Sequence, residues 1–500
     1  MEYVLSGFAS LAEFWWLIPL GVTIGVFIGS IPGFNATNTL IILLPFTLGM
    51  RSEGALAFMA SVYGASEVGG AIPAILFNVP GTGGAAATCL DGYPMGQKGL
   101  AQEALVIAFL SSCIAGIVTP IITILAFPSL RWVVFYFGTV ENFIIILFGI
   151  ALIAQITGKN PVKGYIAGFL GLLLGAIGYD HVYSVPRATF GILQLFDGMP
   201  RVPVIVGLFA LSEALVMSEK ITNDEKILYS KLESSWGKTW NGVKLTFKHT
   251  FTLIHSTIVG FIVGIIPGVG ASIASFVAYQ QTYAVAKDKE TFGQGNPKGV
   301  IASEAANNSI TCGALIPTLT LGIPGSSTAS IMLIILLAHG VPIGPRLFQT
   351  DPSLAYSVVI ALFLAHFLLL FIGMPLTKLM AKGVNIPVEV LIPTIISFVL
   401  MGAFVERRFL FDVSLALFFA VVGYIMKKTG YPVHCLLLGV ILGPPAEQYF
   451  LRGIQLGRGD LAIFFSKPLG NVLWILLLVS VVGPVLYGKF ASKKIPVGEE

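Results

Sequence analysis

One motif, made of two glycines and a Pro-Gly pair, occurs twice in this chain, each time within an apolar stretch. The first copy reads Gly25-Val-Phe-Ile-Gly29-Ser-Ile-Pro32-Gly33 and the second reads Gly260-Phe-Ile-Val-Gly264-Ile-Ile-Pro267-Gly268, at a constant offset of 235 residues. Because proline lacks a backbone donor and clashes inside a helix, each copy predicts a helix that breaks in an apolar environment. Broken helices at corresponding positions of two halves are typical of secondary transporters built from repeats.

The repeat extends beyond this motif. Gly69-Gly70-Ala-Ile-Pro73 is followed by Pro80-Gly81, and Gly313-Ala-Leu-Ile-Pro317 is followed by Pro324-Gly325, now at an offset of 244 residues. The second copy therefore holds nine more residues between its motifs, which we assign to the polar stretch from Lys287 to Lys298. Ordered matches of this kind predict an internal duplication.

The composition places the chain in a membrane. Of its 500 residues 55% are hydrophobic and 11% charged, and the mean hydropathy is +0.88, whereas a soluble domain has about 25% charged residues. We predict an all-α polytopic membrane protein with about 10–14 transmembrane elements, some of them half-helices or re-entrant hairpins. The net charge of +4 comes without a basic cluster interleaved with aromatic residues, so no nucleic-acid partner is expected.

Four segments follow from the hydropathy: a first repeat half (1–217), a polar amphipathic linker (218–250), a second repeat half (251–490) and a polar tail (491–500). Lysines in the linker favour the cytoplasmic side, and Trp236 and Trp240 favour a position against the membrane surface. The loop from Lys287 to Lys298 lies on the same side as the linker only if the apolar segment between them re-enters the membrane or spans it an even number of times. The sequence leaves this choice open, and an inverted orientation of the two halves is an inference from the repeat.

Small polar residues follow each predicted helix break. A broken helix exposes an N-terminus, whose N–H groups and positive dipole end attract carboxylates, and its freed carbonyl groups suit a hard cation such as sodium. We therefore predict one central substrate and ion site formed by the breaks of both halves. The predicted residues are Pro32, Gly33, Asn35, Thr37, Asn38, Thr39, Pro80, Gly81, Thr82, Gly83, Pro267, Gly268, Gly270, Ser272, Asn307, Asn308, Pro324, Gly325, Ser326, Ser327 and Thr328.

Three of the polar residues have competing interpretations. Asn307 and Asn308 either bind substrate or ion, or cap the next helix. Glu67 lies in an apolar run and is a candidate ion or proton site, or else it faces an aqueous cavity without a role. Ser and Thr in membrane helices also often bond only their own backbone.

Enzymatic motifs are absent from the sequence. It contains no Walker A motif, no HExxH and no recognisable Ser-His-Asp pattern. Its four cysteines are scattered, without metal-ligand spacing. We expect no catalytic residues, no enzyme activity and no cofactor apart from a coupling ion.

As a set, the motifs resemble the TctA family, the large membrane subunit of bacterial tripartite tricarboxylate transporters. The matching stretches in the first half are Gly29-Ser-Ile-Pro-Gly33, Leu44-Pro-Phe-Thr47, Ala74-Ile-Leu-Phe-Asn-Val-Pro-Gly81 and Thr88-Cys-Leu-Asp-Gly-Tyr-Pro94. Those in the second half are Gly264-Ile-Ile-Pro-Gly268, Glu304-Ala-Ala-Asn-Asn308, Ile316-Pro-Thr-Leu-Thr-Leu-Gly-Ile-Pro-Gly325, His339-Gly340 and Gly344-Pro345.

The resemblance implies a multi-pass protein of the bacterial inner membrane that works with a small membrane subunit (TctB-like) and a periplasmic solute-binding protein (TctC-like). It implies import of an organic di- or tricarboxylate, such as citrate, by symport with a cation, usually sodium. Glu67 departs from the family pattern, in which a neutral residue is expected, and a carboxylate there would alter either ion coupling or charge preference. The competing hypotheses are an autonomous cation-coupled carrier without a binding protein and an ion-conducting pore.

Overall fold

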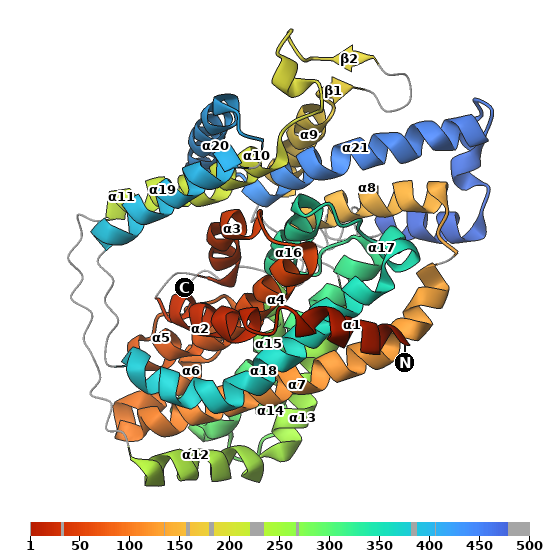
Figure 1. The fold of residues 1–500 in the computed structure, drawn as a ribbon. Coiled ribbons are helices and arrows are strands. Elements are labelled where there is room, and N and C mark those ends of the chain that lie inside the picture. Colours follow the sequence, from red (N-terminus) through yellow and green to blue (C-terminus); the bar gives the residue numbers. More distant parts are fainter. Residues whose placement is uncertain are drawn as a thin grey trace, which may run out of the picture.

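The computed structural model describes residues 2–31, 35–134, 136–156, 161–179, 185–220, 235–266, 270–381, 388–405 and 407–478. This part of the chain is nearly all helix (Figure 1). Its one sheet pairs β1 (Gly178–Tyr179) with β2 (Pro186–Arg187) in antiparallel register. The all-α fold predicted from the sequence is confirmed.

The helices up to residue 220 are α1 (Glu2–Ala12), α2 (Leu17–Gly29), α3 (Ala36–Thr47), α4 (Ser52–Gly69), α5 (Ala71–Phe77), α6 (Cys89–Met95), α7 (Ala101–Val134), α8 (Thr139–Ile156), α9 (Pro161–Gly175), α10 (Arg201–Val206) and α11 (Ser212–Lys220). Those that follow are α12 (Trp236–Lys248), α13 (Thr250–Ile265), α14 (Gly270–Val285), α15 (Pro297–Leu321), α16 (Ser327–Ala338), α17 (Pro345–Thr350), α18 (Pro352–Ala381), α19 (Val388–Val405), α20 (Leu410–Thr429) and α21 (Val433–Leu456).

The helices form two layers (Figure 1). The larger layer holds α1, α2, α4–α7 and α12–α18, in which α15 packs on α7, α13 and α14, and α18 packs on α4 and α7. The second layer holds α8–α11 and α19–α21, in which α21 packs on α8 and α9, and α20 packs on α10 and α11. Helix α3 joins the layers, since it contacts α4 and α16 on one side and α10 and α19 on the other.

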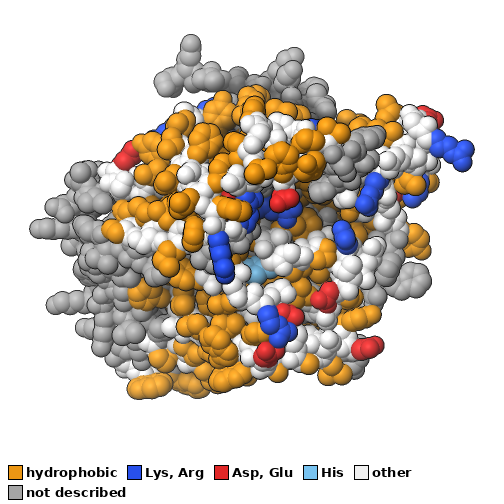
Figure 2. All heavy atoms as spheres, turned by 45° about the horizontal axis from the view of Figure 1, so that its top comes forward, with side chains coloured by type: hydrophobic (Ala, Val, Ile, Leu, Met, Phe, Trp, Pro, Cys, Tyr) orange, Lys and Arg blue, Asp and Glu red, His pale blue; other side chains and the backbone are white. Residues whose placement is uncertain are grey.

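Several helices suit a lipid environment. Among the described residues, four helical stretches are long and apolar enough to cross a membrane, namely Ser52–Phe77, Cys89–Leu130, Pro352–Gly373 and Leu410–Thr429. The number becomes six if two sharply bent pairs, α1 with α2 and α12 with α13, each count as one span. Figure 2 shows hydrophobic side chains spread over the described part of one face, among other side chains and backbone, with charged side chains gathered in a few places. The chain is therefore a polytopic membrane protein, while the total of 10–14 elements stays a prediction.

The two halves use their matching glycines in the same way. A Cβ atom added at Gly69 in α4 would lie 2.7 Å from the Val26 carbonyl oxygen of α2. One added at Gly313 in α15 would lie 2.6 Å from the Phe261 carbonyl oxygen of α13. Gly69 and Gly313 are aligned residues, and so are Val26 and Phe261. Helices α2 and α4 therefore pack on each other through the same contact that joins α13 and α15. This equivalence supports the predicted duplication.

The helix ends before the second Pro-Gly pair of each half also correspond. Asn78 follows α5 (φ 58°) and Gly322 follows α15 (φ 72°), and both adopt the left-handed conformation that closes a helix. The Val79 amide donates to the Pro73 carbonyl at 3.3 Å, and the aligned Ile323 amide donates to the Pro317 carbonyl at 3.2 Å. The breaks predicted before Pro80 and Pro324 are thus confirmed.

Candidate functional site

The breaks of the two halves meet in space. The Thr37 hydroxyl at the start of α3 lies 3.0 Å from the Thr328 hydroxyl at the start of α16, and both residues are buried. The residue aligned with Thr37 is Ser272, at the start of α14. Gly84 is aligned with Thr328. A Cβ atom added at the preceding residue, Gly83, would lie 2.5 Å from the Ser272 hydroxyl oxygen. Each half therefore places a small hydroxyl side chain against the break of the other half.

A second pair of contacts crosses the halves. The Tyr63 hydroxyl of α4 lies 3.4 Å from the Ser326 hydroxyl, in the loop before α16. Asn307 of α15 is aligned with Tyr63, and a Cβ atom added at Gly84 would lie 1.7 Å from the Asn307 side-chain oxygen. A side chain at position 84 would require the Asn307 side chain to move. The side chains of the two long helices therefore reach across to the opposite loops in equivalent fashion.

Two helix N-termini are fixed where the breaks of the two halves meet, around Thr37 and Thr328. We call this place the crossing. The Asn35 side chain caps α3 by accepting from the Asn38 amide at 2.8 Å, and Thr39 donates to the Asn35 carbonyl at 3.0 Å. The Ser326 hydroxyl caps α16 by accepting from the Ala329 amide at 3.1 Å. Asn35 and Ser326 therefore hold the positive ends of two helix dipoles near the Thr37–Thr328 contact. Such ends favour anions such as carboxylates.

Three buried oxygen atoms beside this crossing have no hydrogen-bond partner among the described residues. They are Glu67 Oε2, Thr82 Oγ1 and Asn307 Oδ1. The Thr82 and Asn307 side chains lie beside the Glu67 carboxyl group, and Asn307 Nδ2 is 3.5 Å from the Glu67 carbonyl oxygen. Buried polar atoms are rarely left without a partner. A carboxylate, a hydroxyl and an amide oxygen form a donor set that suits a hard cation.

Glu304, another buried acid of the region, accepts a hydrogen bond on each carboxylate oxygen. Its Oε1 atom accepts from Thr88 at 2.5 Å and its Oε2 atom accepts from Ser112 at 2.9 Å. These bonds tie α15 to the loop before α6 and to α7. Each Glu304 carboxylate oxygen therefore accepts from a protein hydroxyl group, whereas Glu67 Oε2 accepts from none of the described residues.

Asn308 lies next to a histidine that the sequence did not single out. Its side-chain oxygen is 3.4 Å from His366 Nε2 of α18, and its side-chain nitrogen donates to the Glu304 carbonyl at 3.4 Å. The buried imidazole is enclosed by glycines, since Cβ atoms added at Gly64 and Gly116 would lie 2.6 Å and 2.0 Å from its ring atoms. His366, Tyr63 and Ser112 were missed because none lies in the repeated motif. The sequence does not show that two glycines on separate helices make room for the same buried side chain. That relation becomes visible only when the packing of the helices is known.

The remaining predicted residues divide into three groups. Pro32, Gly33, Pro267 and Gly268 lie outside the described residues. Gly81 and Gly325 serve close packing, since added Cβ atoms would lie 2.6 Å from the Cα atoms of Gly70 and Ala314 respectively, an aligned pair. The adjacent residues Pro80 and Pro324, together with Gly270 and Ser327, lie at the predicted breaks. Within the described ranges, no group of three or more His, Cys, Asp or Glu could hold a metal ion.

The fold and this crossing define a class: an all-helical membrane protein with paired helix breaks from two halves at one buried polar site. The family model of the tripartite tricarboxylate transporter TctA family matches residues 16–438. The chain belongs to this family.

Two relatives come from Agrobacterium vitis. An uncharacterized 52.8 kDa protein in the TAR-I ttuC' 3'region is 32% identical over 464 residues, which cover 93% of this chain and 91% of the relative. An uncharacterized protein in the TAR-II ttuC' 3'region is 31% identical over 213 residues, which cover 43% of this chain and 88% of the relative. No solved structure matches the chain.

Proposed function

We propose that this chain is the large membrane subunit of a binding-protein-dependent secondary transporter in the bacterial inner membrane. It imports an organic di- or tricarboxylate together with a cation, and sodium is the proposed coupling ion. The observation that carries this proposal is the crossing of breaks from both halves, with two capped helix N-termini beside three unpartnered buried oxygens. This arrangement offers an anion and a cation neighbouring positions in one buried site.

Sodium fits the three oxygens by their chemistry. The Glu67 carboxylate, the Thr82 hydroxyl and the Asn307 amide oxygen are hard donors. A bound cation would offset the charge of a carboxylate that lies in a buried environment, where an isolated charge is costly. It would also bring positive charge close to the crossing, where the substrate carboxylates are proposed to bind.

Carboxylate binding is proposed to rest on backbone groups at the crossing, with two arginines of a separate cavity guiding the anion toward it. A cavity of about 200 Å³ lies between the two layers, and Arg201 and Arg346 line it. Its wall includes Leu321 and Gly322, which immediately precede the Pro324-Gly325 break. No Asp or Glu of the described residues lines this cavity. We propose that it leads an anion toward the crossing.

Transport then requires alternating access. We propose that the two halves insert in opposite orientations and that a unit carrying the crossing moves relative to a fixed scaffold. The two layers offer such a division, because the main helix packing lies within each layer and α3 contacts helices of both. The proposed partners are a small membrane subunit and a periplasmic solute-binding protein that delivers the carboxylate.

Uptake into proteoliposomes tests the proposal. The chain and its small membrane partner are reconstituted, and a panel of labelled carboxylates is offered with and without binding protein and a sodium gradient. Uptake that needs both supports the tripartite symporter. Uptake without the binding protein supports an autonomous carrier, and sodium-independent uptake of every substrate contradicts sodium coupling.

Glu67→Gln sharpens this test. Because it removes the charged member of the proposed cation site, it should raise the sodium concentration for half-maximal uptake by about tenfold or more. Glu304→Gln is the matched control, since it neutralises a neighbouring buried acid whose oxygens already have partners. An unchanged sodium dependence in Glu67→Gln, with uptake retained, would exclude Glu67 as a sodium ligand.

A further inference from the structure

A groove lies at the corner where α12 meets α13 and the chain bends by 70°. It has a volume of about 360 Å³ and is bounded by the last turn of α12, the first turns of α13, the end of α14 and the start of α15. Its cationic side chains are Lys248, Lys287 and Lys298, with His249 and His255 beside them. We call it the α12–α13 groove.

The groove carries net positive charge. Lys298 donates to Asp288 at 2.6 Å, and this hydrogen bond holds the pKa of the Asp288 carboxyl group below its usual value. The Asp288 carboxylate therefore offsets the charge of Lys298. No Asp or Glu of the described chain lines the groove itself, so Lys248 and Lys287 leave it with an excess of positive charge.

An exposed apolar strip runs away from this groove. Helix α13 exposes four large apolar side chains at spacings of three or four residues, which places them on one helix face. They are Phe251, Ile254, Ile258 and Ile262. The neighbouring α14 also exposes large apolar side chains, at Ile273, Phe276 and Val285. Since Phe251 and Val285 line the groove as well, the positive charge and the apolar strip form one continuous surface.

Helix α12 sets the depth of the groove in the membrane. Its side chains Trp236 and Trp240 are 82% and 61% exposed, and it carries Lys238, Lys244 and Lys248. Helices with exposed tryptophans and lysines on a polar face lie in the membrane interface. The groove at the end of α12 then lies at the level of the lipid headgroups, with the apolar strip of α13 extending into the hydrocarbon region.

We propose that the α12–α13 groove binds an anionic phospholipid. The headgroup phosphate lies between Lys248 and Lys287, and the acyl chains follow the exposed faces of α13 and α14. A basic pocket between helices supplies charge complementarity to such a headgroup. The apolar strip favours a lipid over a free anion, since a free anion gains nothing from it. The bound lipid joins the α12–α13 corner to the loop between α14 and α15.

Lipid binding to the full chain tests this proposal. The protein is purified in a neutral detergent and titrated with dioleoyl phosphatidylglycerol or dioleoyl phosphatidylcholine, with bound lipid counted by native mass spectrometry. Lys248→Gln with Lys287→Gln should weaken phosphatidylglycerol binding by about tenfold or more, since each lysine near an anionic headgroup contributes to its attraction. Phosphatidylcholine should bind weakly to both forms.

The matched control is Lys244→Gln with Lys289→Gln, which removes the same charge from α12 and from the same loop but outside the groove. It should change binding little. An equal loss in the control would overturn the site, because diffuse charge would then explain the attraction. Equal binding of phosphatidylcholine would also overturn it. A final arm adds inorganic phosphate or glycerol 3-phosphate, and displacement of the lipid by either at similar concentrations would assign the groove to a free anion. If the double variant fails to fold, the single variants Lys248→Gln and Lys287→Gln should each weaken binding several-fold.

Discussion

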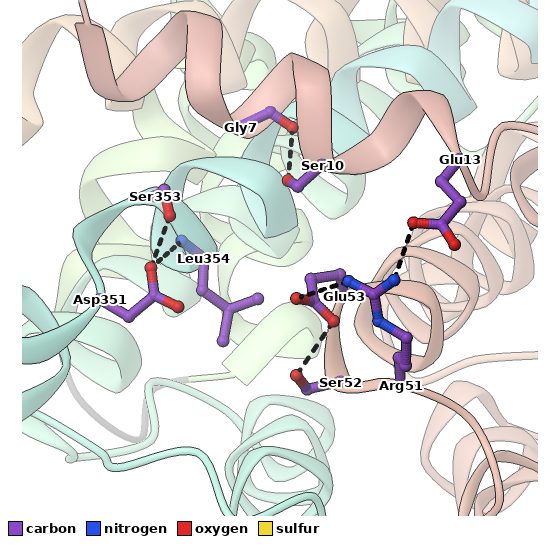
Figure 3. Close-up of polar contacts among 9 residues, drawn as sticks. All are labelled: Gly7, Ser10, Glu13, Arg51, Ser52, Glu53, Asp351, Ser353 and Leu354. Atoms are coloured by element: carbon purple, nitrogen blue, oxygen red, sulfur yellow. Dashed lines mark hydrogen bonds and ion pairs between the residues drawn. The ribbon is translucent and has the colours of Figure 1, made fainter.

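Each half has a corner where an amphipathic helix is followed by a bend and an apolar helix. The two corners share this backbone arrangement but differ in the side chains that line them. Helices α1 and α2 meet at 79° and α12 and α13 meet at 70°, at aligned positions of the two halves. At the first corner Arg51 donates to Glu13 at 2.8 Å and lies 3.5 Å from Glu53 (Figure 3). The Arg51 guanidinium also lies over the Phe14 ring. At the second corner the residue aligned with Glu13 is Lys248, and the basic groove stays open.

This difference teaches that the two corners share a backbone arrangement and not a chemical environment. The second corner gathers lysines from α12 and from the loop before α15, whereas the first corner holds a triad with two acids and one arginine. Lysine excess marks the cytoplasmic side of a membrane protein. The comparison supports the proposal that the corners face opposite sides of the membrane.

The second corner also contains the extra residues of the second half. These lie in the loop from Lys287 to Lys298, and the buried Asp91 of α6 holds this loop in place. Asp91 accepts from the Gly295 amide at 2.8 Å, the Asn296 amide at 2.7 Å and the Tyr279 hydroxyl at 2.8 Å. These partners lie about two hundred residues further along the chain, so Asp91 joins the two halves.

Among the substitutions that test this comparison, Asp91→Ala is expected to change the stability of the protein most. The substitution leaves two backbone donors and one hydroxyl without their charged partner in a buried place, at a cost of about 3 kcal/mol or more. The thermal unfolding midpoint of the purified protein should fall sharply, and the loop from Lys287 to Lys298 should become sensitive to protease. A stable variant with a protected loop would show that Asp91 does not anchor the second corner.

Next in size are Gly69→Ala and Gly313→Ala, a matched pair. Each new methyl group would meet a carbonyl oxygen of the adjacent helix within 3 Å, so overpacking should destabilise the protein by about 1–3 kcal/mol in both cases. Gly49→Ala is the control, because no atom lies within 4 Å of its added Cβ. Thermal unfolding of the three variants measures this directly. A large loss in one variant and none in the other would break the equivalence of the α2–α4 and α13–α15 pairs.

Arg51→Gln should have a smaller effect. The Arg51 and Glu13 side chains are more than half exposed, and exposed ion pairs contribute only about 0–1 kcal/mol. The unfolding midpoint should shift slightly at low salt, and the shift should shrink at high salt because salt screens the pair. A large shift that does not depend on salt would mean that packing of Arg51 on Phe14, and not the charge, closes the first corner.

The smallest change in stability is expected from substitution of Asp288. Its carboxyl pKa is lowered in the folded protein by the Lys298 hydrogen bond, so the stabilisation is present above its unfolded pKa of about 4 and is lost as the pH falls through the lower folded value. Asp288→Asn should therefore be slightly less stable than the parent protein at neutral pH, and the two should converge under acid conditions. Unfolding midpoints across this range test it, and a difference that persists in acid would contradict the linkage.

Much of the architecture could be predicted from the sequence because glycine and proline have few alternatives in a membrane helix. The breaks before Pro80 and Pro324 and the helix contacts of Gly69 and Gly313 follow from that restriction. The central crossing could be outlined because small polar residues follow each break. The partners of Glu304 and the position of His366 could not, since these contacts depend on how distant helices pack and leave no periodic mark in the sequence.

The central claim is that the two halves lie in opposite orientations around one site, and side-specific labelling of the corners tests it most directly. Glu13→Cys and Lys248→Cys place thiols at aligned, exposed positions in a background with Cys89, Cys113, Cys312 and Cys435 replaced by serine or alanine. A membrane-impermeant thiol reagent is applied to intact cells and to permeabilised cells. We predict that the Glu13→Cys thiol reacts in intact cells and that the Lys248→Cys thiol reacts only after permeabilisation. Reaction of both thiols from the same side would contradict the inverted arrangement.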